Sequence, residues 1–270
     1  MSELVTTSID DGVARVSLNR PDKLNALTLD TLEQLIATGQ RLRSDRTLRS
    51  VVLSGEGDSF CAGLDFATVL REPRRVAAAF AVRPWRGTNV FQEACWVWRR
   101  LPVPVIAAVQ GHCLGGGVQI ALAADFRVTA PDARWSVLEA KWGIIPDMTG
   151  IKALSQQVGM DVAKRLTMTG ETVTGSEAVR LGLATQEDPD PYAGALALAA
   201  TIAESSPDSV AAAKRLFNRT WSASDRRTFR WERLEQARLL LGSNAAEARR
   251  ANTRRERPAY APRAGINPRG

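Results

Sequence analysis

The chain has 270 residues, of which 44% are hydrophobic and 24% are charged, with 20 glycines and 13 prolines. These values are typical of a folded globular protein and exclude a disordered chain, a collagen-like repeat and a coiled coil. Three cysteines without a CxxC pair and a single histidine favour neither a disulfide framework nor a zinc site, which fits a reducing compartment. No secretory signal pattern opens the chain, and no apolar run reaches about 18 residues. We therefore expect a cytoplasmic protein without a membrane span.

The net charge of +7 is uneven along the chain. From Lys214 to the end, 15 Lys and Arg residues stand against 5 Asp and Glu residues, so the first 213 residues sum to −3. No nucleic-acid motif and no basic groove with interleaved aromatic residues accompanies these arginines. The pattern favours a solvated helix face and a basic terminus over nucleic-acid binding. Attraction of an anionic small ligand stays open.

Strand-like and helical segments alternate through the first half of the chain. Two β-rich runs flank Asp10-Asp11-Gly12 and predict a hairpin, and Thr28 precedes apolar residues at helical spacing. In chain order the expected elements are strands at 4–9, 13–18 and 49–53, a helix at 29–42, a helix at 91–100, a strand at 104–109, a helix at 115–124 and a strand at 126–130. Such alternation predicts an α/β fold with a largely covered sheet.

The second half of the chain is predicted to be helical. The expected helices are 151–158, 161–167, 176–181, 192–204, 208–221, 225–241 and 244–252. Breaks at proline and serine predict a core over 1–195, a C-terminal helical segment over 196–257 and a flexible basic tail over 258–270. Residues 71–86, rich in arginine, predict a mobile surface insertion, either a cover over a site or an ordinary solvated loop.

Two glycine-bearing turns follow predicted strands, one over 54–65 and one over 111–119, and the second opens a helix. Three successive glycines, Gly115 to Gly117, indicate that something approaches the backbone closely. A helix N-terminus suits a phosphate or a developing oxyanion, but neither GxxxxGK[ST] nor a complete GxGxxG fingerprint is present. Two interpretations remain: an oxyanion hole with one N–H from each turn, or tight packing of helix on strand.

Several motifs occur in one order along the chain. They are Asn19-Arg20-Pro21 with Asn25-Ala26-Leu27, Ser54-Gly55-x-Gly57 with Phe60-Cys61-Ala62-Gly63-Leu64-Asp65, Pro104 to Val109 with Gly111-x-Cys113-Leu114-Gly115-Gly116-Gly117, and Gly143-Ile144-Ile145-Pro146. Together they span about residues 15 to 185 and resemble the crotonase superfamily of enoyl-CoA hydratases and isomerases.

The resemblance implies an α/β fold, a crotonase-like spiral of ββα repeats packed as two sheets. C-terminal helices are then expected to cover the active site and to make the contacts of a homotrimer or a dimer of trimers. The implied substrate is an acyl-CoA thioester, with coenzyme A as part of the substrate and with no metal or redox cofactor.

The resemblance also assigns roles to residues of the two turns. The N–H groups of Leu64 and Gly116 would hold the thioester carbonyl, and the Ala62 carbonyl, next to Gly63, would contact the CoA adenine. The segment Lys23-Leu24 would support the pantetheine and phosphates. The physics agrees, since enolising a thioester places charge on oxygen, where each preorganised donor is worth about 3 kcal/mol.

Proton transfer depends on the residues at two further positions. Hydratases of the family use a glutamate pair, and the matching residues here are Gln119 and Glu139. Gln119 can orient a group but cannot carry a proton, whereas a lone Glu139 suffices to shift a double bond. Asp147 matches an aspartate that does chemistry in dienoyl-CoA isomerases and in the 4-chlorobenzoyl-CoA dehalogenase branch. It could pair with Glu139 beside an apolar wall that includes Trp142 and Ile144, which would raise one pKa.

We therefore favour an isomerase that shifts a C=C bond in an enoyl- or dienoyl-CoA. One alternative is a hydratase in which Glu139 acts alone while Gln119 orients water. Another is a non-catalytic protein that binds CoA esters. The structural alternatives are that Glu139 forms an ion pair with Lys141 and that Asp147 caps a turn. His112 and the buried cysteines are interpreted as structural residues.

Overall fold

The computed structural model describes residues 3–265 and contains two β-sheets. The six-stranded sheet has the order β1-β2-β3-β4-β6-β9, with β1 antiparallel to β2 and the other neighbours parallel. Its strands are β1 (Val5–Asp10), β2 (Val13–Leu18), β3 (Ser50–Gly55), β4 (Val105–Val109), β6 (Phe126–Thr129) and β9 (Gln186–Glu187). The smaller sheet has the order β5-β7-β8 and consists of β5 (His112–Leu114), β7 (Arg134–Ser136) and β8 (Val173–Thr174).

The helices fall into a core set and a C-terminal set. The core set comprises the 3₁₀ helices η1 (Pro21–Lys23) and η2 (Leu138–Trp142) and the α-helices α1 (Leu29–Ser44), α2 (Phe66–Val69), α3 (Pro73–Phe80), α4 (Val90–Arg99), α5 (Gly116–Ala123), α6 (Gly150–Gln157), α7 (Met160–Thr169), α8 (Gly175–Leu181) and α9 (Pro191–Ala203). The C-terminal set comprises α10 (Pro207–Thr220), α11 (Asp225–Leu240) and α12 (Ser243–Arg254).

The predicted α/β architecture is confirmed. Successive units send one strand to the large sheet and the next to the small sheet before a helix follows, as in β4–β5–α5 and β6–β7–η2. The expected hairpin forms between β1 and β2, where Asp11 and Gly12 both have positive φ, as a tight two-residue turn requires. The helix predicted after Thr28 is α1, and the Thr28 hydroxyl caps it by accepting from the Thr31 N–H.

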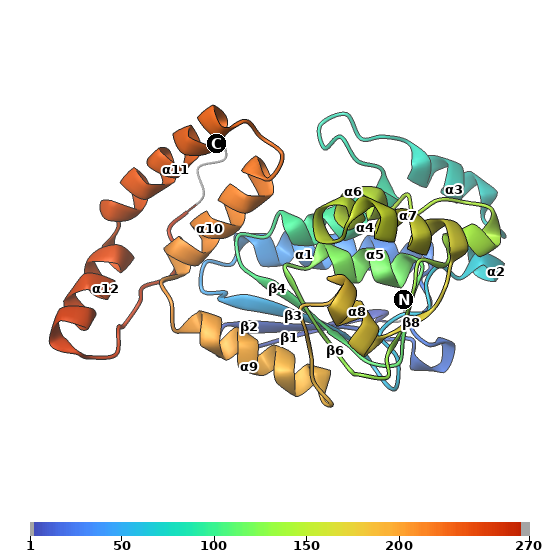
Figure 1. The fold of residues 1–270 in the computed structure, drawn as a ribbon, viewed down its shortest axis with the longest axis horizontal. Coiled ribbons are helices and arrows are strands. Elements are labelled where there is room, and N and C mark those ends of the chain that lie inside the picture. The colour runs from blue at the N-terminus through green and yellow to red at the C-terminus, as the bar shows by residue number, and fades with distance from the viewer. Residues whose placement is uncertain (1–2, 266–270) are drawn as a thin grey trace.

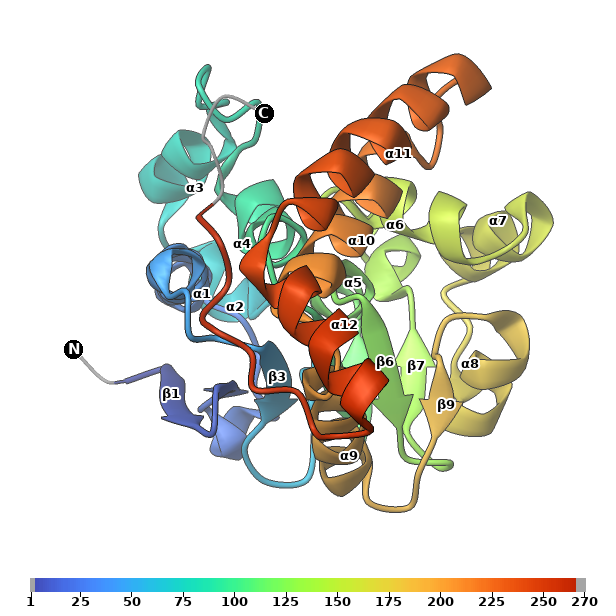
Figure 2. The same cartoon turned by 90° about the vertical axis from the view of Figure 1, so that its left-hand side faces the viewer.

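Helices cover both faces of the large sheet (Figures 1 and 2), and its strands β3 and β4 are buried along their whole length, with alternate residues facing different layers. Val51 and Leu53 of β3 belong to the main core beneath α1 and α4, whereas Val52 points to a second core beneath α9. This period of two explains why β3 and β4 are continuous apolar runs, since both faces of a parallel sheet must be covered.

The predicted boundary at residue 195 falls inside α9 and is corrected by the structure. Ala195 and Ala199 of α9 pack against the sheet, so the whole helix belongs to the core layer. The chain leaves the sheet only after Ala203, at Ser206-Pro207, where α10 begins. From there α10, α11 and α12 extend away from the sheet as an arm of three helices (Figure 1).

The arginine-rich stretch over 71–86 is not an irregular loop. Residues 73–80 form α3, with Pro73 at the first helical position and Ala79 buried against the core. Val76 and Phe80 share the inward side of this short helix because residues three and four apart lie on one face. The sequence pattern was dominated by charge and proline, which concealed this short apolar face.

The segment after α12 is docked on the protein as far as the structure describes it, which corrects the expectation of a flexible tail for residues 258–265. The Arg263 side chain is buried, and its backbone exchanges hydrogen bonds with Arg46. The Ala264 N–H donates to Asp208 of α10 at 2.7 Å. The last part of the predicted tail, 266–270, lies outside the described residues. Between residues 3 and 265, no helix combines the length and apolarity that a membrane span needs.

Asn25 provides a test of how the core holds the first glycine-bearing turn. Its buried side chain accepts from the Arg20 N–H at 2.8 Å and donates to the carbonyls of Glu56 (2.9 Å) and Ser59 (2.7 Å). We expect Asn25→Ala to lower the free energy of unfolding by about 2–4 kcal/mol, because carbonyls lose buried partners. In urea titrations Asn19→Ala, which removes a bond at the surface, should cost less than about 1 kcal/mol. Equal losses in the two variants would contradict this role.

Candidate active site

A cavity of about 680 Å³ opens beside the N-terminus of α5. Its walls come from the turn at 62–64, from α2, α3 and α4, from the start of α5 and from residues 138–148. Segments far apart in the sequence therefore meet at one place. Most of the site residues predicted from the sequence line this cavity: Ala62, Gly63, Leu64, Gly116, Gln119, Glu139, Trp142 and Asp147.

Two backbone N–H groups converge on this cavity from the two predicted turns. Neither the Leu64 N–H nor the Gly116 N–H donates to an acceptor within residues 3–265. The two lie close together, since a β-carbon built on Gly116 would be 3.9 Å from the Leu64 nitrogen. Gly116 opens α5, so its N–H also lies at the positive end of that helix. This pair of free donors is what an oxyanion hole requires.

Backbone pairing holds the two turns together. Cys61 pairs with Cys113 in an isolated parallel bridge, in which the Cys61 N–H donates to His112 O at 2.8 Å and the Leu114 N–H donates to Cys61 O at 2.9 Å. A β-carbon on Gly117 would lie 2.5 Å from Cys61 O, so glycine is required there by close packing alone. Both interpretations of the glycines therefore apply, each to a different residue. Gly117 is required for close packing, and Gly116 has an N–H without an acceptor.

Glu139 and Gln119 form a hydrogen-bonded chain at the floor of the cavity. The Gln119 amide donates to Glu139 Oε1 at 2.7 Å, while its own oxygen accepts from the Gly150 N–H at 2.9 Å. Both side chains are buried. Glu139 Oε2 has no hydrogen-bond partner within residues 3–265. One carboxylate oxygen is thus fixed, and the other is buried without a partner beside Gly115, whose β-carbon position is 3.9 Å away.

The carboxyl groups of Glu139 and Asp147 both hold protons more tightly than usual. Burial raises the pKa of Glu139; the hydrogen bond from Gln119 opposes this effect, and the charge of Asp147 adds to it. Burial likewise raises the pKa of Asp147, which is half-buried and lines the same cavity. Two carboxyl groups with raised pKa values in one cleft form a pattern typical of acid–base sites.

Trp142 and Ile144 supply part of the apolar wall, as the sequence suggested. Trp142 stacks on Phe66 with ring centroids 4.6 Å apart. Val76 and Phe80 of α3 and Phe91 of α4 complete the wall on the other elements. The stretch over 71–86 therefore contributes a helix that lines the site, a role that its arginine content did not reveal.

The proposed CoA-supporting residues lie around the first turn. The Leu24 carbonyl accepts from the Ala62 N–H at 2.9 Å, so this segment borders the cavity wall at Ala62. Lys23 is exposed at the end of η1 and is not part of the cavity lining. The structure thus brings Leu24 to the site through the backbone and leaves the Lys23 side chain in solvent.

Sequence reasoning missed the residues that hold the site in place. Arg20 bonds to the Asp65 carboxylate at 3.2 Å, and Asp65 caps α2 through the Thr68 N–H, so the first turn is clamped at its end. Thr149 has φ +74, a strained conformation for a β-branched residue, in the turn between Asp147 and α6. The first two residues stood in quoted motifs, but nothing in the sequence indicated that they pair.

The lone histidine and the cysteines lie outside the reacting groups of the cavity. His112 Nδ1 is 3.0 Å from the Ser59 hydroxyl, an interaction that joins the second turn to the first. Burial raises the pKa of Cys61 to about 12, so its thiol stays protonated. Neither residue lines the cavity.

Comparison with known proteins identifies the family of the chain. A family model described as enoyl-CoA hydratase/isomerase matches residues 8–251. The chain belongs to this family. The crotonase resemblance carried by the glycine turns is thereby confirmed.

Relatives within the family have different activities. The chain is 35% identical over 210 residues to a short-chain-enoyl-CoA hydratase of Clostridium acetobutylicum, covering 77% of this chain and 78% of that protein. It is 33% identical over 219 residues to the mitochondrial Delta(3,5)-Delta(2,4)-dienoyl-CoA isomerase of Homo sapiens, covering 78% and 67%. The solved structure of an enoyl-CoA hydratase from Bacillus anthracis matches with a TM-score of 0.87 and 28% identity, over 95% of this chain and 98% of that one.

The raised pKa of Glu139 predicts a pH-dependent stability. Because the folded pKa lies above the unfolded value of about 4.3, the stabilising contribution of this group is complete below that pH and is lost as the pH rises through the folded pKa. Glu139→Gln keeps the shape without the charge, so the variant should gain stability relative to the wild type between about pH 4 and about pH 8. Urea unfolding of both proteins at the two pH values measures the difference between their free energies of unfolding. Glu204→Gln, at an exposed position, is the control. If the difference in free energy of unfolding between Glu139→Gln and the wild type does not increase with pH, the burial argument is contradicted.

Proposed function

We propose that this enzyme shifts a carbon–carbon double bond in an enoyl- or dienoyl-CoA. The thioester oxygen would sit between the N–H groups of Leu64 and Gly116, and Glu139 Oε2 would carry the proton. The first turn, with the Ala62 carbonyl and the segment Lys23-Leu24, would support the CoA moiety. The proposal combines the family with the site geometry, since two free donors and one available carboxylate oxygen border one cavity.

The observation that supports the proposal most directly is the hydrogen bonding of Gln119. Its amide bridges Glu139 and the Gly150 N–H, so the residue positions a carboxylate and cannot itself exchange a proton. Adding water across a double bond requires a proton to leave water while carbon is protonated, which is work for two acid–base groups. Moving a double bond requires one group that takes a proton and returns it.

The proposed step conserves atoms and electrons. Glu139 removes the α proton of a 3-enoyl thioester, and the C–H electron pair forms an enolate whose charge rests on the thioester oxygen between the two N–H donors. The pair then returns, the double bond moves into conjugation with the carbonyl, and the γ carbon takes the proton back from Glu139. No water or other co-reactant enters.

Asp147 is proposed as a second proton carrier. It lines the same cavity, and burial raises its pKa, which favours the protonated form. In the proposed reaction Asp147 delivers a proton at a carbon distant from Glu139. A pair of this kind suits a dienoyl thioester, in which the two ends of the conjugated system lie further apart.

Hydration is the second candidate because hydratase names are common among the relatives. In that reaction Glu139 would act alone while a free N–H of Gln119 oriented water. Incubation of the purified enzyme with 3-hexenoyl-CoA and with crotonyl-CoA separates the candidates. Isomerisation converts 3-hexenoyl-CoA into a conjugated thioester of the same mass, which is detected by its absorbance, whereas hydration makes crotonyl-CoA heavier by one water, which is detected by mass spectrometry. Tight binding of thioesters without turnover would indicate a non-catalytic binding protein instead.

Glu139→Gln tests the proton carrier directly. Removing the base while keeping the hydrogen bond from Gln119 should lower kcat for 3-hexenoyl-CoA about 10³-fold, with KM changed less than about threefold. Steady-state kinetics that follow formation of the conjugated thioester measure both constants. Glu204→Gln should leave both unchanged, and a kcat near the wild-type value in Glu139→Gln would remove this residue from the mechanism.

Gly116→Ala tests the oxyanion hole. The added β-carbon would lie 3.0 Å from Leu27 Cδ1, 3.2 Å from Met148 Sδ and 3.9 Å from the Leu64 nitrogen, and would therefore crowd the two donors. We expect kcat/KM to fall about 10²-fold, because the thioester oxygen can no longer reach both N–H groups. Gly159→Ala, at a negative φ before α7 and outside the cavity, is the matched control. Full activity in Gly116→Ala would refute the assignment.

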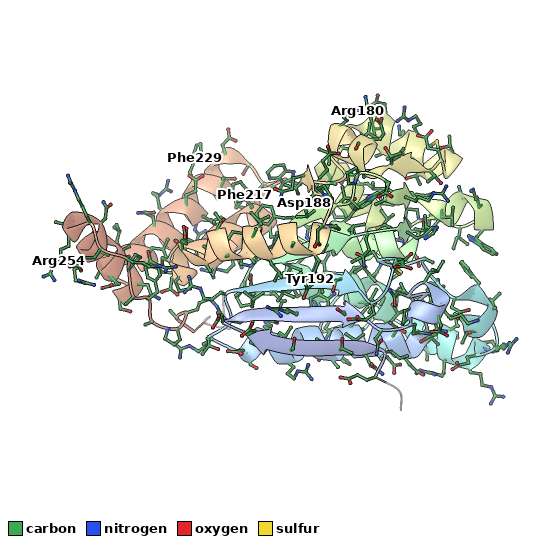
Figure 3. All side chains as sticks on the ribbon, turned by 90° about the horizontal axis from the view of Figure 1, so that it is seen from below. Arg180, Asp188, Tyr192, Phe217, Phe229 and Arg254 are labelled. Carbon is green, nitrogen blue, oxygen red and sulfur yellow. The ribbon has the colours of Figure 1, made fainter. Side chains whose placement is uncertain are left out.

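We also propose that the chain assembles as a homotrimer or a dimer of trimers through its helical arm. Large apolar side chains are exposed on this arm (Figure 3, where Phe217 and Phe229 are labelled): Phe217, Trp221, Phe229, Leu240 and Leu241. Such a surface is typical of a protein interface. Light scattering after size exclusion should give three or six times the chain mass. The double variant Phe229→Glu with Leu241→Glu should shift the protein to monomer, while Ile9→Glu on β1 should not; a monomeric wild type would refute the proposal.

A further inference from the structure

The wall of the cavity has an unusual side-chain composition. Within the described part of the chain, no Lys, Arg, His, Ser, Thr or Tyr side chain lines it. Its carboxyl and amide side chains are Gln119, Glu139 and Asp147, and all three lie at the end where the proposed proton transfer takes place. The rest of the wall is apolar except for the indole N–H of Trp142 at the rim, and it offers no side-chain acceptor to a hydroxyl.

Four aromatic rings line this apolar part as two contacting pairs. Phe66 and Trp142 are stacked at 4.6 Å, and Phe80 and Phe91 are tilted at 4.8 Å. In each pair one ring comes from the rim: Trp142 is 58% exposed and Phe80 is 51% exposed. Each pair therefore leaves ring surface free for a further group in the cavity.

We propose that the acyl group carries an aromatic ring without ionised or hydroxyl substituents, held against these rings. This inference rests on the proposed function, which places an acyl-CoA in the cavity. A flat ring gains stacked or edge-on contacts with aromatic side chains beyond the burial of its area, whereas a linear chain gains only the burial. A hydroxyl or carboxylate on a ring inside the cavity would lose hydrogen bonds to water, and the apolar wall offers in exchange only the indole N–H of Trp142 at the rim.

Saturated thioesters test the inference apart from the chemistry, because they have no double bond to shift. We choose 3-phenylpropanoyl-CoA and nonanoyl-CoA, which have the same number of acyl carbons, and 3-(4-hydroxyphenyl)propanoyl-CoA as the hydroxylated analogue. Isothermal titration calorimetry gives their dissociation constants for the full-length protein. We expect the phenyl thioester to bind about fivefold more tightly than nonanoyl-CoA and also about fivefold more tightly than its hydroxylated analogue.

Substitutions of the aromatic side chains test whether they cause the preference for the phenyl thioester. Phe80→Leu and Trp142→Leu keep an apolar wall, and each should weaken 3-phenylpropanoyl-CoA binding about fivefold while changing nonanoyl-CoA binding less than about twofold. Because Trp142 is at the rim, its variant keeps the test valid even if Phe80→Leu fails to fold. Phe126→Leu is the control, since Phe126 packs on the α9 face of the sheet.

The outcomes separate the two proposals. Equal binding of phenyl and nonanoyl thioesters, or variants that weaken both alike, would overturn the aromatic preference and leave the acyl-CoA site intact. Equal binding of the hydroxylated analogue would overturn the exclusion of polar substituents. Failure of every thioester to bind would instead overturn the proposed function itself.

Discussion

The site depends on the backbone contact between two turns that lie about fifty residues apart in the sequence. The Cys61–Cys113 bridge aligns them, and the close approach at Gly117 leaves no room for a side chain between them. As a result the Leu64 and Gly116 N–H groups meet at one point without acceptors of their own. The donors belong to the backbone of paired segments and therefore need little reorganisation when charge develops on a bound oxygen.

The part of the site that contains the carboxyl groups is also held in a fixed geometry. Gln119, on α5, and Gly150, at the start of α6, together hold one oxygen of Glu139 and leave the other free. Burial raises the pKa of Glu139 and of Asp147, so in the proposed reaction the apolar wall that would enclose a substrate also adjusts the acidity of the two carboxyl groups. Binding surface and chemistry are thus coupled through the same side chains.

The arm of α10 to α12 illustrates what local patterns convey and what they omit. Its helices were predictable from apolar spacing and from breaks at serine, glycine and proline. The boundary between the core and these helices was predicted at residue 195, which is too early in the chain. Ala195 and Ala199 of α9 pack on the sheet, but small residues of this kind do not indicate such a contact in the local sequence pattern. The same holds for α3, where a few apolar side chains are masked by arginines, and for the residues up to 265, whose docking depends on Arg263 meeting the end of α1.

The sequence by itself determined the alternation of strands and helices, the two glycine turns, the family and the acidic residues Glu139 and Asp147, since these follow from local periodicity and from motifs. Only the tertiary structure decided that Gln119 is engaged at both ends, that Arg20 clamps Asp65, and that α3 lines the cavity. Those facts depend on contacts between segments far apart in the chain. Local propensity contains no information about which donor will meet which acceptor once the sheets have formed.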